Sequence, residues 1–278
     1  MNEIITPVIV LGTLGLLFGV LLSLASRVFA VVTDPRVDEV LQALPGANCG
    51  ACGFPGCEGL AKAMASGEAA ANDCPIGGQE TADKVASILG TTAGNLQKEV
   101  AVVLCQGDCD KAKDKYKYEG IQDCRIADKL SNGHKECGFG CLGCGTCYDV
   151  CPFDAIEMIN GLAVIDRDKC TACMKCIEIC PKNIIELMPY DNRTVVKCKS
   201  TDKGKDVRGY CEVGCIGCKI CVKNCPEDAF EFDNFLAKID YDKCTNCMIC
   251  VEKCPTNAIP DVIDEVNLKK KNRDKIAS

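Results

Sequence analysis

Aromatic residues are scarce in this chain: it has no tryptophan, and Phe, Tyr and Trp together make up only 5% of its 278 residues. Large apolar and aromatic side chains normally supply much of the packed interior of a chain of this length. We therefore expect inorganic groups to occupy part of the interior, with ligation supplying part of the folding free energy.

Positive charge is also in short supply. Against 39 Asp and Glu there are 32 Lys and Arg, which gives a net charge of −7. Nucleic acid phosphates require a basic face, so no nucleic-acid partner is expected. The lysine run Lys269–Lys271 is expected to belong to a solvated tail, and the single histidine, His134 in SNGHKE, to a solvated loop.

Cysteine, by contrast, is abundant, with 26 residues. Such a density is typical of short secreted disulfide scaffolds. This chain is long, and many of its cysteines are only three positions apart, a spacing poorly suited to joining distant segments. Metal ligation by thiolates is the better interpretation, and it requires a reducing compartment.

No basic residue precedes the long apolar run near the N-terminus. Every residue between Glu3 and Arg27 is uncharged. At a rise of about 1.5 Å per residue, this run can cross a hydrocarbon core of about 30 Å. A signal peptide would have a basic start and a shorter apolar centre, so a transmembrane anchor is predicted. Because Arg27 and Arg36 follow the run, the rest of the chain is expected on the cytoplasmic side of a single-pass anchor.

The cysteines follow an internal repeat, C-x2-C-x2-C-x3-C-P, which occurs four times. The copies begin at Cys141, Cys170, Cys215 and Cys244, and one shift along the chain, called the repeat shift below, maps the first two copies onto the last two. The intervening segments agree as well, since LAVIDRDKC (162–170) matches LAKIDYDKC (236–244). The chain therefore contains a duplicated unit, and each unit has two similar halves.

This spacing is typical of cubic iron–sulfur clusters. Three cysteines at i, i+3 and i+6 wrap one cluster, while the cysteine before proline binds the neighbouring one. Zinc normally uses two separated pairs in a tetrahedral site and fits this pattern poorly. The predicted ligand sets are Cys141, Cys144, Cys147 and Cys180; Cys170, Cys173, Cys176 and Cys151; Cys215, Cys218, Cys221 and Cys254; and Cys244, Cys247, Cys250 and Cys225.

A fifth group of cysteines lies in NCGACGFPGCEGLAKAMASGEAAANDCP (48–75), ahead of the repeats. Three cysteines are close together, and a fourth returns after an alanine-rich helical stretch that begins near Glu58. Small residues let the backbone approach a cluster and donate N–H bonds to its sulfurs. A [4Fe–4S] cluster is predicted here, with zinc as the competing metal. Its ligands would be Cys49, Cys52, Cys57 and Cys74.

Six cysteines lie outside these five sets. Four of them, Cys105, Cys109, Cys124 and Cys137, could hold a sixth cluster. The repeat shift maps Cys124 onto Cys198 and Cys137 onto Cys211, whereas VVLC (102–105) locally resembles VVKC (195–198), so the alignment is ambiguous here. Cys198 and Cys211 lack the two further cysteines that a cluster would need, and they are interpreted as buried thiols.

The chain has an apolar helix, followed by the CGACGFPGC segment and then by ferredoxin-type repeats. This order resembles that of the B subunits of the Rnf complex, a bacterial membrane-bound, ion-translocating ferredoxin:NAD oxidoreductase. The resemblance implies that soluble ferredoxin delivers electrons to the C-terminal clusters. They would then pass to the Cys49–Cys74 centre beside the cell membrane, while other Rnf subunits reduce NAD and move Na⁺ or H⁺. The chain would be part of an enzyme complex and would have no substrate-converting site of its own.

Two other functions fit parts of the pattern. Tandem ferredoxin repeats also suit a polyferredoxin arm of a hydrogenase or formate-oxidising membrane complex, although CGACGFPGC favours the Rnf interpretation. A zinc scaffold or metal store belongs to a different class, and its protein would be colourless where iron–sulfur clusters are brown.

The predicted fold is α+β, with a transmembrane helix, a small helical Fe–S domain and two tandem ferredoxin-like domains that each hold two [4Fe–4S] clusters. The predicted boundaries are 1–30 for the anchor, 31–90 for the N-terminal cluster domain, 91–136 for a connecting segment, 137–190 and 191–262 for the ferredoxin domains, and 263–278 for a charged tail.

Overall fold

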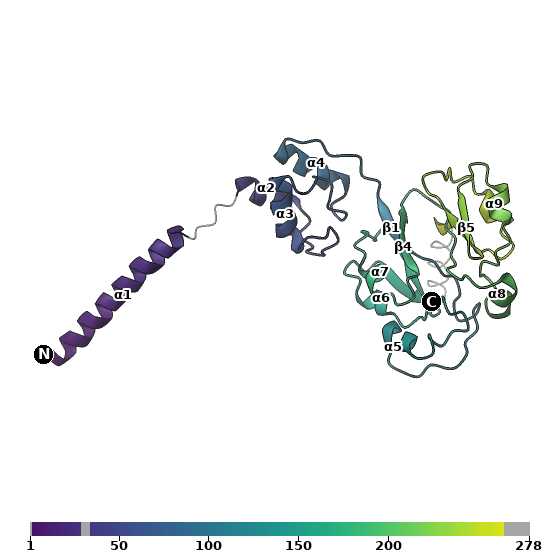
Figure 1. Cartoon of the computed structure of the whole chain (residues 1–278), viewed down its shortest axis with the longest axis horizontal. Coiled ribbons are helices and arrows are strands. Elements are labelled where there is room, and N and C mark those ends of the chain that lie inside the picture. The colour runs from purple at the N-terminus through teal and green to yellow at the C-terminus, as the bar shows by residue number, and fades with distance from the viewer. Residues whose placement is uncertain (1, 29–33, 264–278) are drawn as a thin grey trace, which may run out of the picture.

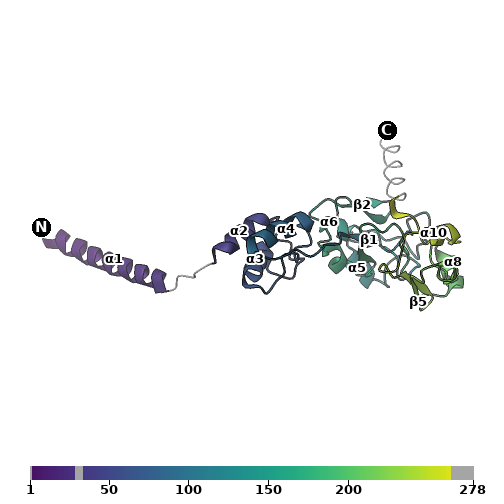
Figure 2. The same cartoon turned by 90° about the horizontal axis from the view of Figure 1, so that it is seen from above.

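The chain forms an elongated molecule whose parts follow one another along its long axis (Figure 1). A computed structural model describes residues 2–28 and 34–263. A single long helix, α1 (Asn2–Val28), stands apart at one end, a three-helix domain follows, and the cysteine-rich repeats form the other end, as the view from above also shows (Figure 2). Residues 29–33, at the predicted end of the anchor, and nearly all of the predicted charged tail lie outside the described residues.

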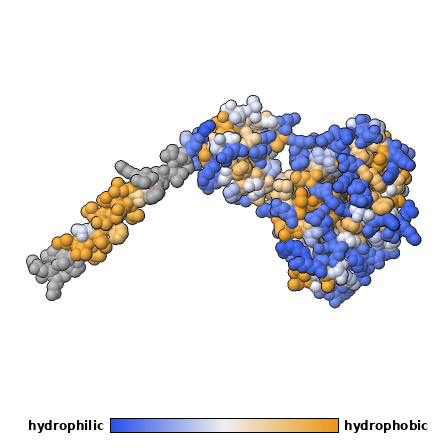
Figure 3. Space-filling view, viewed as in Figure 1, coloured by the Kyte–Doolittle hydropathy of each residue, from blue (hydrophilic) through white to orange (hydrophobic). Residues whose placement is uncertain are grey.

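Over its apolar stretch, helix α1 is not buried by any other part of the chain that the structure describes. The segment Ile9–Ser26 has a mean hydropathy of 2.3 and none of it is buried. Figure 3 accordingly shows this part of the helix as an exposed hydrophobic surface. Leu11, Leu16 and Leu22 are among its most exposed side chains. Apolar side chains exposed in this number are unfavourable in water, whereas lipid accommodates them. The N-terminal apolar helix predicted from the sequence is therefore present.

The three-helix domain consists of α2 (Pro35–Ala43), α3 (Gly56–Ser66) and α4 (Gly78–Leu89). Asp34 caps α2 by accepting the N–H of Arg36 at 2.9 Å, and Pro35 occupies the first helical position. One fully buried side chain from each helix, Val40, Leu60 and Val85, meets in the core. Cys57 and Cys74 are buried in the same cluster of side chains, so a cysteine site is part of this domain's core.

The strands of the described residues form three antiparallel pairs. Two are hairpins: β2 (Ile156–Ile159) with β3 (Leu162–Ile165), and β5 (Phe230–Asp233) with β6 (Leu236–Ile239). The repeat shift maps the register of the first hairpin onto that of the second, so the sequence duplication is also a structural one. The third pair joins β1 (Glu99–Val103) to β4 (Ile185–Pro189), which attaches the predicted connecting segment to the first ferredoxin unit.

The hairpin turns show how the two units diverged. Asn160 and Gly161 both have positive φ, as a type I′ turn requires. A Cβ at Gly161 would lie 2.5 Å from the Cys109 sulfur, so glycine is needed there for space as well. In the second unit Phe235 takes this position at φ 63°, a strained conformation for an aromatic residue.

Each half-unit contains one short helix, and a residue with left-handed backbone precedes it. That residue lies shortly before the third cysteine of each repeat and turns the chain back toward the other cysteines. The helices and their preceding residues are α6 (Thr146–Asp149) after Gly145, α7 (Lys175–Ile179) after Met174, α9 (Ile220–Asn224) after Lys219 and α10 (Ile249–Lys253) after Met248. Two further helices, α5 (Cys124–Lys129) and α8 (Gly204–Tyr210), precede the two units.

The cores of the two units combine aliphatic side chains with cysteines. Cys141, Cys147 and Cys176 are buried among Ile, Leu and Ala in the first unit, and Cys250 is buried in the second. A further apolar cluster joins β1 and β4 to Val195 and Val262, so that the units pack against each other. The described part of the chain is thus α+β, as predicted.

Candidate iron–sulfur sites

The second ferredoxin unit has two cavities lined by four cysteines each. One cavity, of about 370 Å³, is bordered by a triplet from residues 215–221 together with a cysteine from the second half-unit. The other, of about 330 Å³, has a triplet from residues 244–250 and a cysteine from the first half-unit. The two sets are Cys215, Cys218, Cys221 and Cys254, and Cys244, Cys247, Cys250 and Cys225. In both cases these are the residues that the repeat predicts together.

Hydrogen bonds to sulfur support both sets. The Ala229 N–H donates to the sulfur of Cys225 at 3.4 Å, and the Ala258 N–H donates to that of Cys254 at 3.2 Å. These bonds are equivalent, because both donors lie four positions after the cysteine that precedes proline. Such bonds stabilise thiolate charge and affect the reduction potential of a bound cluster.

In the first unit, a cavity of about 370 Å³ contains three of the four predicted cysteines and one unexpected cysteine. Cys141, Cys147 and Cys180 line it as predicted, but the fourth lining cysteine is Cys124. Cys144 is buried next to Cys124, and the Cys144 sulfur lies 3.7 Å from the Leu142 carbonyl oxygen. A hydrogen bond between the two thiols lowers the pKa of Cys124 and raises the pKa of Cys144. Five thiols are thus available for four ligand positions.

We expect Cys124 and Cys144 to substitute for each other. A serine at either position leaves one thiol beside the cavity, so each single variant should keep its cluster. The double variant Cys124→Ser/Cys144→Ser should lose about four irons per chain. Iron and acid-labile sulfide counts on anaerobically purified protein measure this.

The matched control for this redundancy is Cys218→Ser, at the position onto which the repeat shift maps Cys144. No fifth cysteine lines its cavity, so this single substitution should remove a cluster. Loss of the first unit's cluster in either single variant would show that one of the two thiols is the sole ligand.

The remaining cysteine set of the first unit also comes together. Burial raises the pKa of Cys176 to about 12, and the charges of Cys170, Cys173 and Cys151 also raise it. The N–H of Ala101 in β1 donates to the sulfur of Cys170 at 3.3 Å. The strand from the predicted connecting segment therefore contributes directly to a ferredoxin site.

In the N-terminal domain, three of the four predicted cysteines share one site. Burial is the main cause of the raised pKa of Cys74, and the charges of Cys57 and Cys52 also raise it. The N–H of Cys57 donates to the Asn48 side chain at 2.8 Å, which fixes the loop against α3. Burial raises the pKa of Cys173 in the first ferredoxin unit, and the charge of Cys49, which lies on the same loop as Cys52, raises it further. The N-terminal site thus faces the first ferredoxin unit.

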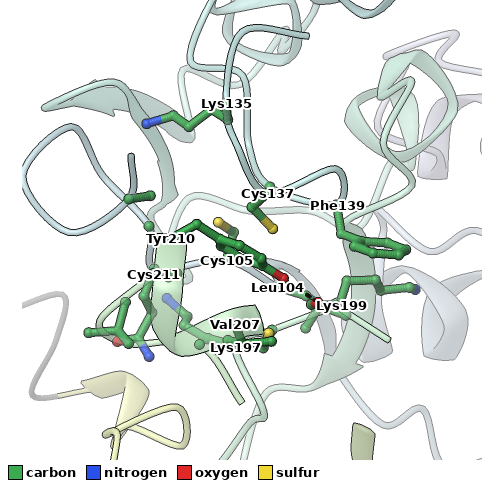
Figure 4. Close-up of a pocket in the computed structure, with 18 residues that line it drawn as sticks. Leu104, Cys105, Lys135, Cys137, Phe139, Lys197, Lys199, Val207, Tyr210 and Cys211 are labelled. Atoms are coloured by element: carbon green, nitrogen blue, oxygen red, sulfur yellow. Dashed lines mark hydrogen bonds between the residues drawn. The ribbon is translucent and has the colours of Figure 1, made fainter. Parts of the chain in front are cut away.

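The four cysteines assigned to a sixth cluster from the sequence are not brought together. Cys105 and Cys137 line a cavity of about 420 Å³ together with Cys211 (Figure 4), and the fourth cysteine that lines it is Cys198. Cys109 is exposed beside Gly161, and Cys124 belongs to the site in the first unit. The cysteines that share this cavity come from both halves of the duplication, whereas the predicted set came from one continuous stretch of the chain.

The single histidine also differs from the expectation of a solvated loop. The His134 ring is half-buried and stacks on Tyr118 with ring centroids 5.7 Å apart. Burial lowers its pKa. It packs in the segment before the first unit and lines none of the four-cysteine cavities described above.

These sites define the class of protein. Cavities lined by thiols, arranged in two ferredoxin units behind an apolar helix, are those of an iron–sulfur electron-transfer protein. Family models match in three places: "Putative Fe-S cluster" over residues 44–76, and "4Fe-4S dicluster domain" over residues 136–181 and again over 214–258.

Three similar proteins identify the family within this class of iron–sulfur proteins. The B subunit of the Na⁺-translocating ferredoxin:NAD⁺ oxidoreductase complex of Acetobacterium woodii is 51% identical over 88% of this chain and 74% of its own length. The B subunit of the ion-translocating oxidoreductase complex of Methanosarcina acetivorans is 46% identical over 87% of this chain and 92% of its own. The B subunit of the proton-translocating ferredoxin:NAD⁺ oxidoreductase complex of Clostridium ljungdahlii is 42% identical, over 88% and 87%.

The chain therefore belongs to the B subunits of the Rnf complex, the ion-translocating ferredoxin:NAD oxidoreductase. It is the iron–sulfur electron-transfer subunit of an enzyme complex, as its sequence predicted.

Proposed function

We propose that this subunit accepts electrons from reduced soluble ferredoxin and conducts them through at least five [4Fe–4S] clusters to the other Rnf subunits. The observation that carries the proposal is the convergence of cysteines from separate half-units on shared cavities. The proposed ligand sets are Cys49, Cys52, Cys57 and Cys74; Cys141, Cys147 and Cys180 with Cys144 or Cys124; Cys151, Cys170, Cys173 and Cys176; Cys215, Cys218, Cys221 and Cys254; and Cys225, Cys244, Cys247 and Cys250.

The residues at these sites fit clusters better than single ions. In the described part of the chain, no three His, Cys, Asp or Glu side chains are arranged to hold one metal ion. A zinc site would need four ligands at about 2.3 Å from one atom. A bound cluster supplies one-electron chemistry, and the protein holds it, excludes water and donates N–H bonds to sulfur.

The arrangement of the sites supports an order of transfer. Burial raises the pKa of Cys173 in the Cys151–Cys176 site, and the loop that carries Cys49 is close enough for the charge of Cys49 to raise it further. Electrons that enter the C-terminal unit would thus cross the first unit and leave through the N-terminal domain toward α1. In this arrangement the clusters form an electron-transfer chain that ends at the membrane, and the cluster domains lie on the cytoplasmic side.

A direct test uses the full chain purified anaerobically in detergent. We expect at least about 20 irons per chain, four for each of five clusters, and a brown colour that bleaches on addition of reduced ferredoxin. A count near 8, or a colourless zinc protein, would overturn the proposal. Bleaching by dithionite but not by reduced ferredoxin would remove ferredoxin as the donor.

The membrane role of α1 can be tested separately. Replacing Leu14 and Leu17 by arginine places two charges in the apolar stretch, at about 2.5–3.5 kcal/mol each at the helix centre. The protein should move from the membrane to the soluble fraction. An alanine pair at the same positions is the control and should stay with the membrane. Unchanged fractionation of the arginine variant would show that another contact holds the protein there.

A further inference from the structure

We propose that a sixth [4Fe–4S] cluster is held by Cys105, Cys137, Cys198 and Cys211, between the two ferredoxin units. This inference rests on the proposed function, since it adds one carrier to the same electron path. Cys105 lies in the connecting segment and Cys137 at the start of the first unit, while Cys198 and Cys211 lie in the second unit.

The first symmetry relation concerns Cys105 and Cys198, which end the matching segments VVLC and VVKC. In both units the residue before this cysteine donates its N–H to a carbonyl oxygen in the last loop of that unit, and the repeat shift maps one acceptor onto the other. The two bonds are Leu104 N–H to the Ile184 oxygen at 2.6 Å and Lys197 N–H to the Ala258 oxygen at 2.8 Å.

The second relation concerns Cys137 and Cys211, which the repeat shift maps onto each other and which each precede a cysteine triplet by four positions. Burial raises the pKa of both thiols, and in both the backbone N–H two positions later, of Phe139 or Val213, acts in the opposite direction. The two pairs of cysteines are therefore equivalent in local structure as well as in sequence. A cluster between them would have two similar halves of the protein around it.

The cavity has room for the same group as the other sites. Its volume of about 420 Å³ compares with about 370 and 330 Å³ for the two cavities of the second unit. Gly107 lies at its wall, where a Cβ would come within 3.6 Å of the Cys211 sulfur, 3.7 Å of the Cys105 sulfur and 2.9 Å of the Ala112 Cβ. A larger residue at position 107 would crowd the space between the thiols.

The four thiols come from distant segments that enclose this cavity (Figure 4). Burial raises the pKa of Cys137 to about 11 and that of Cys198 to about 12. The positive charge of Lys135, itself buried and lining the cavity, acts in the opposite direction on the pKa of Cys211. Iron bound at this site would be held by these four residues as thiolates.

Contacts from the cavity to both units suggest what the sixth cluster does. The N–H of Cys141, a ligand residue in the first unit, donates to the sulfur of Cys105 at 3.5 Å. At the equivalent place, burial raises the pKa of Cys198, and the backbone N–H of Cys215 in the second unit acts in the opposite direction. The backbone of a ligand residue from each unit thus lies beside a thiol of the sixth site. The cluster would take one electron from the second unit and pass one to the first.

The test counts iron, sulfide and zinc in the full chain, purified anaerobically in detergent and reconstituted with iron and sulfide. We expect about 24 irons in the unmodified chain and about 20 in Cys198→Ser/Cys211→Ser, at four per cluster. The matched control is Cys109→Ser, which replaces an exposed cysteine outside the cavity and should keep about 24 irons.

Each outcome decides one question. About 20 irons in both the unmodified chain and the double variant would overturn the sixth cluster and leave the five-cluster path intact. About 20 irons with one zinc that the double variant loses would assign the site to zinc and also overturn it. A count near 8 would instead refute the proposed function. If the double variant does not fold, the count on the unmodified chain is decisive by itself.

Discussion

Removal of iron and sulfide from the purified protein should abolish the cooperative unfolding of the two ferredoxin units. The secondary-structure elements of the two ferredoxin units are short paired strands, such as β4, and helices of little more than one turn, such as α6 and α7. Neither kind of element is stable alone in water. Their cores include cysteines at central positions, so a cluster connects parts of the chain that otherwise have few apolar contacts.

The expected size of this effect is large. Structural zinc sites contribute about 10–16 kcal/mol to folding in small domains, more than the whole stability of many proteins. Circular dichroism should show a cooperative thermal transition of the ferredoxin units in the loaded protein and none in the stripped one. Helix α1 contains no cysteine and serves as an internal control, because its helical signal should survive in detergent. A stripped protein that still melts cooperatively would show that the aliphatic clusters suffice.

Much of this architecture was predictable because cysteine spacing is a local constraint. The spacing C-x2-C-x2-C allows few loop geometries around a cluster, and four left-handed residues preceding the short helices realise that turn in each copy. The apolar run near the N-terminus likewise determines a helix by length and composition alone. The helix expected near Glu58 begins at Gly56 for the same local reasons.

The cavity of Cys105, Cys137, Cys198 and Cys211 was not predictable in this way. Its thiols meet through packing between the two units, and the distance along the chain from Cys105 to Cys211 exceeds one whole repeat. The similarity of VVLC and VVKC indicates that Cys105 and Cys198 are equivalent positions. The repeat shift, however, pairs Cys198 with Cys124. Only the two equivalent backbone bonds to Ile184 and Ala258 show which alignment holds in space.

Cys124 illustrates a second limit of sequence reasoning. Cys144 completes the spacing of the repeat and is therefore the predicted ligand. Cys124 lies well before the repeat, at the start of α5, and its N–H donates to the Thr146 hydroxyl at 2.7 Å. This tertiary contact places a thiol at the cavity wall, where no spacing rule could predict it.

Exchange of ligands between half-units has a consequence that distinguishes it from two independent loops. Cys254 belongs by sequence to the second half-unit, yet it lines the cavity of the Cys215–Cys221 triplet. Cys225 belongs to the first half-unit and lines the cavity of the Cys244–Cys250 triplet. Loss of either cysteine should therefore destroy the cluster of the other half-unit's triplet.

Two exposed cysteines, Cys218 and Cys247, report on the two clusters. A ligated thiolate is protected from iodoacetamide, whereas an exposed free thiol reacts. In Cys254→Ser, labelling of Cys218 should rise from almost none to nearly complete while Cys247 stays protected, and Cys225→Ser should give the reverse. Peptide mass spectrometry of the natively alkylated protein measures both sites in one sample. Labelling of Cys247 in Cys254→Ser, with Cys218 still protected, would mean that each half-unit binds its cluster alone, and the arrangement of cysteines between the half-units would then need another explanation.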